Sequence, residues 1–433
     1  MRPLALTLAV AAGWGRAALV AGTTALVSGL LLVAVSVVRL WEQPAHVLDE
    51  RVLGAVRDEG TRAGAVFGVL LLTLPLVLLL DQAVRLGTTA RRRRFAALAA
   101  AGATRSDLRR WGAVEVGLPA LAGGLLGIPV WWLLRQVHAT SPDATTVVPT
   151  SVGPGAWALL VVLLTGAYGA LVGVRVGTRV AADGDRRRGG GSRPPRPWAL
   201  LLLLAAGALL ASGAIDDSDL GMIAVLALLV LAIAGLAPWT AYVVARLVAG
   251  RTASPALLLA SRRLQGDPGP AGRAAAAVGA VGLTAGVLSV YVPDVYATQT
   301  WDRGYYLGPA AVAGAGALVA TIAIAVSLAV HLTESVLERR RELAALVATG
   351  VPASVVSDSQ RLECLLATVP LGVVGAAVGG LGYASLSDTT GPVYVVAAVA
   401  GTGLVCAGAC GLITRLLRPW LREAVHPEQL RTT

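Results

Sequence analysis

The chain has 433 residues, of which 56% are hydrophobic and only 14% are charged. A soluble domain carries roughly 25% charged residues, so this composition excludes a soluble globular enzyme and a disordered protein. The net charge is +11, and all 36 basic residues are arginines in short clusters between long apolar runs. The long apolar runs and the low charge predict an all-α polytopic membrane protein. A nucleic-acid-binding face needs a basic surface on a soluble body, so we expect no nucleic-acid partner.

The chain contains no lysine. A P-loop requires a lysine that reaches the nucleotide phosphates, so the chain cannot act as a P-loop ATPase on its own. We predict no catalytic residue, no metal and no cofactor in it. Its three cysteines, Cys364, Cys406 and Cys410, lie in apolar runs. Cys406 and Cys410 share a helix face, which favours helix packing over a metal or redox pair.

Ten apolar runs approach the roughly 20 residues that a helix needs to cross a bilayer. In chain order they are 17–39, 63–85, 112–134, 154–178, 198–214, 220–245, 274–291, 309–332, 362–382 and 392–414. Residues 3–12 form a shorter apolar stretch. It is either a signal-peptide core or, as we prefer, an amphipathic elbow helix lying on the membrane before the first span.

The arginines predict the orientation of these spans. With the N-terminus in the cytoplasm, only six of the 36 fall outside, namely Arg39, Arg51, Arg57, Arg62, Arg135 and Arg303. Cytoplasmic loops carry the arginine excess in membrane proteins. We therefore expect both termini in the cytoplasm.

A repeat relates residues 91–127 to residues 339–375 at an offset of 248, with 13 identities in 37 ungapped positions. Arg91, Arg92 and Arg93 meet Arg339, Arg340 and Arg341; Gly102 meets Gly350, and Glu115 meets Glu363. Each copy of the repeat contains four spans. An even number of spans lies between the start of the first copy and the start of the second, so both copies have the same orientation in the membrane. The sequence therefore predicts two parallel four-helix repeats joined by a two-helix linker.

In each repeat a basic helix ends at a glycine that can reverse the chain, and a short segment leads into the next span. The segments are Ala103, Thr104, Arg105 and Ser106 after Gly102, and Val351, Pro352, Ala353 and Ser354 after Gly350. Two such projections form a two-fold docking surface for a two-fold cytoplasmic partner. The expected divisions are an elbow helix at 1–16, a first repeat at 17–182, a basic Gly/Pro linker at 183–197, a two-span linker at 198–250, a second elbow at 251–273, a second repeat at 274–418 and a cytoplasmic tail at 419–433.

This pattern, a basic helix, a glycine turn and then a glutamate at the head of a Gly-rich span, resembles the FtsX-like permease domain of ABC transporters. It occurs twice, at about 63–180 and 309–418. The resemblance implies a multi-pass permease of the bacterial plasma membrane, served by two copies of a separate ATP-binding subunit that supplies ATP and Mg. It also implies that the segments after Gly102 and Gly350 couple closure of those subunits to the spans.

The outer loops are shorter than in many relatives, which carry a large extracytoplasmic domain. Residues 40–62 and 292–308 cannot form one, since domains rarely fall below about 50 residues. We therefore expect export or extraction of a hydrophobic or amphipathic substrate, such as a lipid, a lipophilic antibiotic or a small peptide, that enters from the membrane. Tyr296, Trp301, Tyr305 and Tyr306 are either an interfacial aromatic belt or an outer recognition patch.

Two further readings remain open. Glu115 and Glu363 are intramembrane carboxylates, which often mark function. They form structural ion pairs, with Arg110 and Arg361 as candidate partners, or they serve a proton- or ion-coupled carrier together with Asp81. The arginine clusters anchor the topology through anionic lipids or touch the ATPase. A scaffold that regulates an extracellular partner is the other alternative.

Overall fold

The computed structural model describes residues 14–42, 88–139, 152–186, 195, 197–213, 219–266, 268–300, 303–387 and 391–424. The predicted span at 63–85, Asp81, Trp301 and the first 13 residues of the N-terminal elbow lie outside these ranges. The chain divides into two compact units, Met1–Gly190 with Gly304–Val312 and Gly191–Arg303 with Ala313–Thr433. The break at Gly190 falls within the segment expected as a linker.

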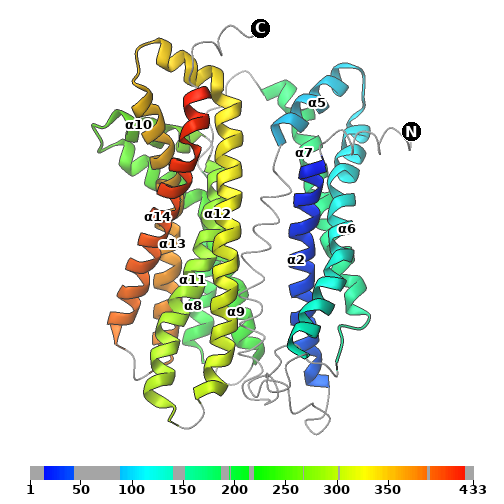
Figure 1. Ribbon diagram of the computed structural model, residues 1–433, viewed down its shortest axis with the longest axis vertical. Helices are drawn as coiled ribbons and strands as arrows, with labels where there is room; N and C mark the ends of the chain where they lie inside the picture. The colour runs from blue at the N-terminus through cyan, green and yellow to red at the C-terminus, as the bar shows by residue number, and fades with distance from the viewer. Residues whose placement is uncertain are drawn as a thin grey trace. The chain divides into compact units, whose positions relative to one another are not determined.

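The first unit is built around one long helix (Figure 1). Its described elements are α2 (Trp14–Val38), η1 (Arg39–Glu42), α5 (Thr88–Ala100), α6 (Arg105–Ala139) and α7 (Trp157–Arg186). Helix α6 packs against α2 on one side and α7 on another, and α5 contacts both α6 and α7. Because α7 continues to Arg186, the beginning of the segment expected as a linker at 183–197 is helical.

The second unit repeats this order around α13 (Figure 1). Its elements are α8 (Leu200–Ala211), α9 (Asp219–Ala249), α10 (Pro255–Gly266), α11 (Pro268–Thr298), most of α12 (Arg303–Ala348, without Gly304–Val312), α13 (Ala353–Ala384) and α14 (Pro392–Ala424). Helix α13 packs against α11 and α14, while α9 packs against α11 and α8 packs against α9. The predicted two-span linker thus belongs to the same compact unit as the second set of helices.

Seven helices in the described part of the chain are long and apolar enough to cross a membrane. Their segments are Ala17–Val38, Arg105–Gln136, Trp157–Arg175, Leu228–Ala249, Ala274–Thr298, Ala353–Ala384 and Pro392–Pro419. The runs expected at 198–214 and 309–332 appear as shorter apolar stretches, Leu200–Ala211 and Tyr306–Ile322. The protein is therefore a polytopic helical membrane protein; the count of ten spans stays a prediction.

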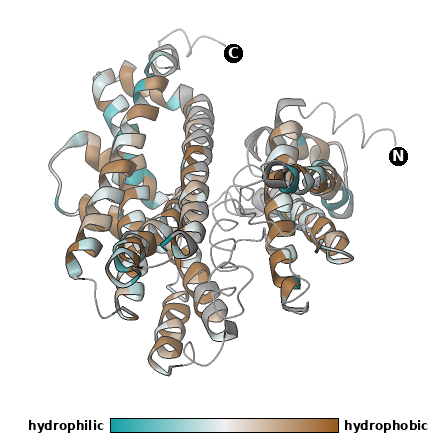
Figure 2. Cartoon of the chain, turned by 60° about the horizontal axis from the view of Figure 1, so that its bottom comes forward, coloured by the Kyte–Doolittle hydropathy of each residue, from teal (hydrophilic) through white to brown (hydrophobic). Residues whose placement is uncertain are grey.

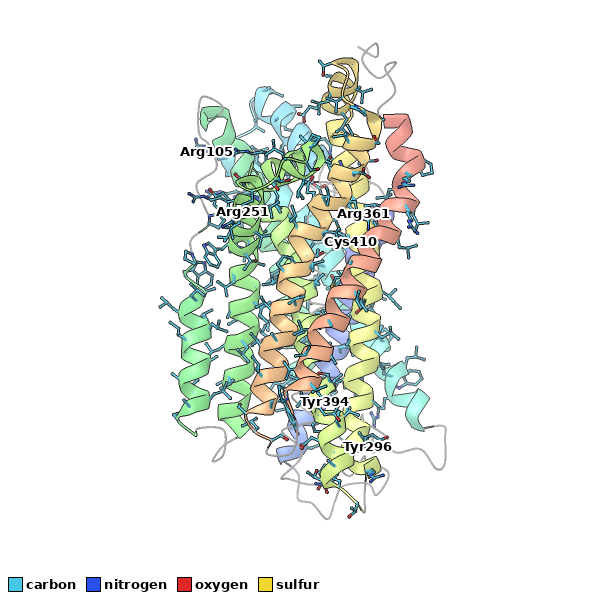
Figure 3. The ribbon with its side chains drawn as sticks, turned by 90° about the vertical axis from the view of Figure 1, so that its left-hand side faces the viewer. Arg105, Arg251, Tyr296, Arg361, Tyr394 and Cys410 are labelled. Carbon is cyan, nitrogen blue, oxygen red and sulfur yellow. The ribbon has the colours of Figure 1, made fainter. Side chains whose placement is uncertain are left out.

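Hydrophobic residues predominate along these helices (Figure 2), and many of the large ones are exposed. Leu404 of α14 is 74% exposed and Leu201 of α8 is 70% exposed. Such continuous apolar surface is rare on soluble monomers, and hydrocarbon is the solvent that suits it. In the second unit, Arg251 and Arg361 lie toward one end, and Tyr296 and Tyr394 toward the other (Figure 3).

Small residues form the contacts between central helices. A Cβ added at Gly375 or Gly379 of α13 would collide with the backbone oxygens of Gly279 and Leu283 in α11. In α6, a Cβ at Gly123 would collide with the backbone of Ala21 in α2. These backbones approach closely only because no side chain intervenes, as small residues allow in membrane helix pairs. The Gly-x-x-x-Gly spacings, Gly123/Gly127 in α6 and Gly375/Gly379 in α13, thus mark packing faces.

Two predicted boundaries were wrong. The segment expected as an outer loop at 292–308 is mostly helical, since α11 continues to Thr298 and α12 begins at Arg303. The second elbow, expected at 251–273, contains a true helix, α10, but α11 already begins at Pro268. Polar residues at a span end can continue a helix into water, and composition alone does not show where it stops.

Candidate functional site

The candidate site consists of two helix–glycine–helix turns, one in each unit. Helix α5 ends at Ala100 and α12 at Ala348, and each is followed by a glycine with positive φ, +94° at Gly102 and +97° at Gly350. Only glycine adopts this backbone region without steric cost. No other group lies within 4 Å of a Cβ placed on either glycine, so the requirement comes from the backbone alone.

The two turns close with the same hydrogen bonds. In the first, Ala103 N donates to Leu98 O at 3.0 Å, and Gly102 N donates to Ala99 O at 3.1 Å. In the second, Val351 N donates to Leu346 O at 3.2 Å, and Gly350 N to Val347 O at 2.9 Å. This pair of bonds defines a Schellman motif, the common glycine-terminated helix end. Every donor and acceptor corresponds at the offset of 248.

The pattern of exposure also corresponds. Gly102, Thr104, Arg105 and Ser106 are exposed, and so are their counterparts, namely Gly350, Pro352, Ala353 and Ser354. Ala103 and Val351 are half-buried. The next helix is then anchored by one deeply buried side chain, Leu108 at 1% exposure and Val356 at 0%. Each turn therefore protrudes from its unit and is fixed to it by this buried side chain. We call such a turn a handle.

Buried apolar residues hold the preceding helix in place. Phe95 of α5 and Leu343 of α12 are 4% and 0% exposed and correspond at the same offset. Leu343 packs with Val336 and Val356 in one cluster, so α12 and α13 are joined across the turn. The alignment of the two repeats did not single out Phe95 and Leu343, because a phenylalanine aligned with a leucine does not count as an identity. Their shared burial would have suggested it.

The two turns differ in how the following helix begins. Thr104 N donates to Asp107 Oδ2 at 3.1 Å, and Asp107 N donates to Thr104 Oγ1 at 3.3 Å. This reciprocal arrangement is a capping box. In the second unit Pro352 occupies the N-cap with φ −59° and makes no side-chain cap bond. The proline ring restricts φ at the start of α13, and this restriction takes the place of the capping hydrogen bonds found in the first turn.

Glu115 forms the ion pair that the sequence favoured, and it does so with Arg94, which was not among the candidate partners. Arg94 Nη2 lies 3.0 Å from Glu115 Oε1, and the glutamate side chain is only 9% exposed. The candidate partner Arg110 is exposed. Arg94 lies on α5, so the pair fastens the helix before the turn to the span after it. Side-chain positions of Arg91, Arg92, Arg93, Arg339, Arg340 and Arg341 lie outside the described set.

The second unit does not reproduce this ion pair. The position that corresponds to Arg94 holds Glu342, which is exposed. Glu363, the counterpart of Glu115, is half-buried. Glu115 is also half-buried, so the two glutamates match in burial as well as in sequence, and only the arginine on the preceding helix is replaced.

The outer aromatic residues are only partly gathered. Tyr296 is 52% exposed at the end of α11, with the Arg303 guanidinium 5.3 Å from its ring centroid. Tyr306 is half-buried, and the side chain of Tyr305, like Trp301, lies outside the described set. Tyr296 and Arg303 form a cation–π pair that suits a membrane interface.

A second outer cluster was missed by the sequence reasoning. Tyr383 Oη donates to Asp294 Oδ2 at 3.1 Å, and Ser387 Oγ donates to Asp294 Oδ1 at 2.7 Å. The Tyr383 ring also meets Tyr291 edge-on, with centroids 5.4 Å apart. These bonds join the C-terminal ends of α11 and α13. No local sequence pattern predicts these hydrogen bonds, because the partners are about 90 positions apart in the chain.

Comparison with known proteins adds one match. Residues 65–181 match the sequence model of the domain described as FtsX-like permease C-terminal. The matched range contains all of α5 and α6, the Gly102 turn and most of α7. Searches of curated proteins and of solved structures found no match.

Proposed function

The chain belongs to the FtsX-like permease family, and we propose that it is the transmembrane subunit of an ABC transporter that couples ATP hydrolysis on separate ATP-binding subunits to export or extraction of a hydrophobic or amphipathic substrate. The observation that carries this proposal is the pair of exposed turns. Two handles with the same hydrogen bonds and the same anchoring suit two copies of one partner. The family match includes the first turn.

Each handle continues into a long helix. Helix α6 has 35 residues and α13 has 32, which at 1.5 Å per residue correspond to about 52 Å and 48 Å. Both exceed the roughly 30 Å of the hydrocarbon core. A displacement applied at Gly102 or Gly350 would therefore reach the far side of the membrane along one continuous helix. Such hinge and shear motions are a standard way in which domains respond to nucleotide.

ATP and Mg belong to the partner in this proposal. The sequence has no lysine with which to build a P-loop. The partner would be present in two copies, one at each turn, and anionic lipids would contact the arginine clusters of α5 and α12. The connection between α11 and α12 covers only residues 299–302, which supports entry of the substrate from the membrane rather than through an outer domain.

The proposal is tested by co-purifying the chain with its ATP-binding subunit and measuring hydrolysis in lipid nanodiscs. Valine at positions 102 and 350 cannot adopt a positive φ without strain, at a cost of about 1–2 kcal/mol each. We expect Gly102→Val with Gly350→Val to reduce the permease-dependent ATPase rate at least severalfold. Asparagine tolerates this conformation, so Gly102→Asn with Gly350→Asn should retain the rate.

Two results would count against the coupling role. One is an unchanged ATPase rate in the double valine variant that still binds the subunit. The other is substrate movement in proteoliposomes driven by a pH gradient without ATP, which would favour the carrier instead. Size-exclusion profiles and thermal unfolding of both double variants serve as folding controls.

A further inference from the structure

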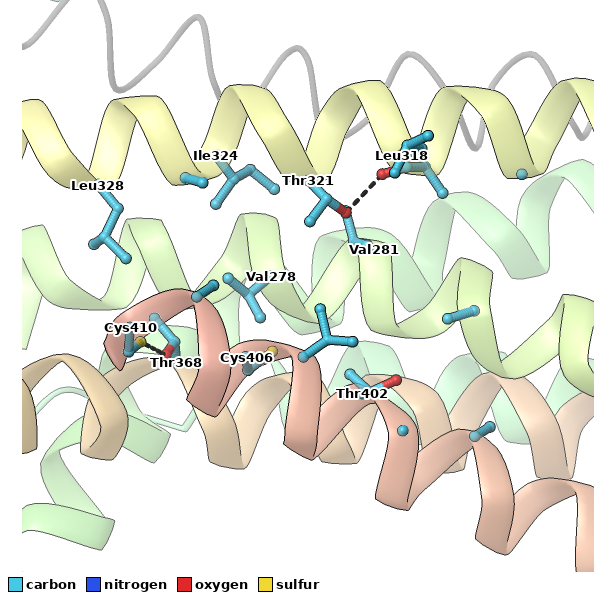
Figure 4. Close-up of a pocket in the computed structure, with 18 of the residues that line it drawn as sticks. Val278, Val281, Leu318, Thr321, Ile324, Leu328, Thr368, Thr402, Cys406 and Cys410 are labelled. Atoms are coloured by element: carbon cyan, nitrogen blue, oxygen red, sulfur yellow. Dashed lines mark hydrogen bonds between the residues drawn. The ribbon is translucent and has the colours of Figure 1, made fainter. Parts of the chain in front are cut away.

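A groove of about 460 Å³ lies inside the second unit (Figure 4). Helices α11, α12 and α14 supply nearly all of its wall, and α13 contributes Thr368. On α12 and α14 the lining positions recur every three or four residues, as one face of a helix does. The volume falls in the range of about 300–1,000 Å³ that small-molecule sites occupy.

The wall offers a ligand hydrocarbon contacts almost exclusively. The residues lining it are aliphatic, glycine, threonine and cysteine, and none of these described residues is charged. Thr321 Oγ1 donates to Ala317 O at 2.7 Å, and Thr368 Oγ1 donates to Cys364 O at 2.9 Å. Since these hydroxyl protons are already used within their own helices, a polar ligand would lose its hydration there and gain little.

The groove opens sideways. Leu318 of α12 and Val405 of α14 both line it, yet they are 63% and 59% exposed. Lining residues of α11 and α14 lie within the membrane-spanning segments Ala274–Thr298 and Pro392–Pro419. The opening between α12 and α14 therefore faces the depth of the bilayer where hydrocarbon chains are the available ligands.

The groove is long enough to hold one such chain. Along α14 its lining extends from Ala398 to Ile413, which is about 22 Å at 1.5 Å per residue. One leaflet contributes about 15 Å, half of the hydrocarbon thickness. An acyl chain that reaches from headgroup to midplane can therefore lie in the groove along its whole length.

We propose that this groove binds a single long acyl chain of a lipid or lipid-like molecule, which enters laterally between α12 and α14. The inference names the substrate class of the proposed transporter and rests on that function only for the idea that the bound chain is cargo. Binding itself needs no ATP-binding subunit. The same chemistry would also hold a resident lipid.

The test uses the full chain in nanodiscs with a phosphatidylglycerol whose 16-carbon chain carries a diazirine. Photolysis should give adducts concentrated on α12 and α14 residues of the groove. Excess lipid with 16-carbon chains should compete, whereas lipid with 6-carbon chains should not. Adducts spread evenly over outward residues such as Leu404 and Leu416 would indicate ordinary boundary lipid and would overturn the proposal.

Groove-filling variants supply the control. Ala409→Leu adds bulk to the wall, and we expect its groove adducts to fall roughly tenfold, because the leucine displaces several methylene contacts of the ligand. Thr402→Leu is a second filling variant, should the first fold poorly. Ala397→Leu adds the same bulk to an exposed position of α14 that does not line the groove, and it should leave labelling unchanged. Equal labelling in filled and control variants would contradict the proposal.

A final arm distinguishes the two sources. In the complex with the ATP-binding subunit, ATP should reduce the groove adducts severalfold if the chain is cargo and leave them unchanged if the lipid is resident. Either result retains the site. If ATP hydrolysis proves uncoupled from the permease but groove adducts persist, the proposed function fails while the binding site stands.

Discussion

At the scale of single residues, the described parts of the two turns are held by different contacts. The Arg94–Glu115 ion pair fastens α5 to α6, and the Thr104–Asp107 capping box fixes the start of α6. The second unit uses Pro352 and the apolar cluster of Leu343, Val336 and Val356 instead. The same turn geometry is thus reached by two different sets of contacts, although the segments after the two glycines differ in sequence.

The ion pair gives a prediction at this scale. Glu115→Gln and Arg94→Gln should each lower the free energy of unfolding, measured by denaturant titration in detergent. The double variant should be less destabilised than the sum of the two, with a coupling of about 1 kcal/mol, between the values for exposed and buried pairs. Arg109→Gln changes an exposed arginine of α6, the helix that carries Glu115, and serves as the control. Additive effects would show that the pair contributes nothing.

At the scale of elements, each unit has a central helix whose glycines let a neighbouring backbone approach. Gly375 and Gly379 of α13 face carbonyl oxygens of α11. On the same interface, the Leu371 side chain of α13 packs close to Gly279 of α11. Close backbone approach and interlocking side chains together hold the two helices against each other.

Alanine substitution tests this contact. Gly375→Ala and Gly379→Ala should each destabilise the protein by about 1–3 kcal/mol, because the added methyl groups overpack α11 against α13. Gly382→Ala lies on the same helix with no group within 4 Å. It should be neutral or slightly stabilising, since alanine favours helix more than glycine does. Thermal unfolding midpoints would distinguish these outcomes, and a neutral Gly379→Ala would show that the two backbones are further apart.

At the scale of the whole molecule, charge and aromatic residues indicate the orientation in the membrane. The arginine excess predicts a cytoplasmic location for both turns. Within the second unit, Arg251 and Arg361 stand toward the end opposite Tyr296 and Tyr394 (Figure 3). This arrangement follows the usual division between arginine-rich cytoplasmic ends and interfacial tyrosines.

Single cysteines test the predicted orientation in a variant that lacks the three native ones. Ser106→Cys and Ser354→Cys should both react with a membrane-impermeant maleimide only in inside-out vesicles. Thr300→Cys, in the connection between α11 and α12, should react only in right-side-out vesicles. If positions 106 and 354 react from opposite sides, a single docking plane for the partner is impossible.

Much of this protein could be predicted locally. The apolar runs predicted the long helices, because a bilayer leaves the backbone of a spanning segment no partners but its own. The glycine turns were also predictable, since a helix that must reverse needs a residue with positive φ. The family resemblance rested on the same residues. The exact helix ends were not predictable, as α11 and α12 show, because polar flanks can remain helical in water.

The sequence by itself determined that the chain crosses a membrane, where its helices turn and which residues repeat. These are properties of hydropathy and backbone conformation, which act over a few residues at a time. Only the tertiary structure decided that Glu115 meets Arg94, that Asp294 meets Tyr383, and that α11, α12 and α14 enclose a groove. Such contacts depend on how each helix is rotated and offset against its neighbours. Close packing of small side chains over the full length of the helices sets that rotation, and no short stretch of sequence contains it.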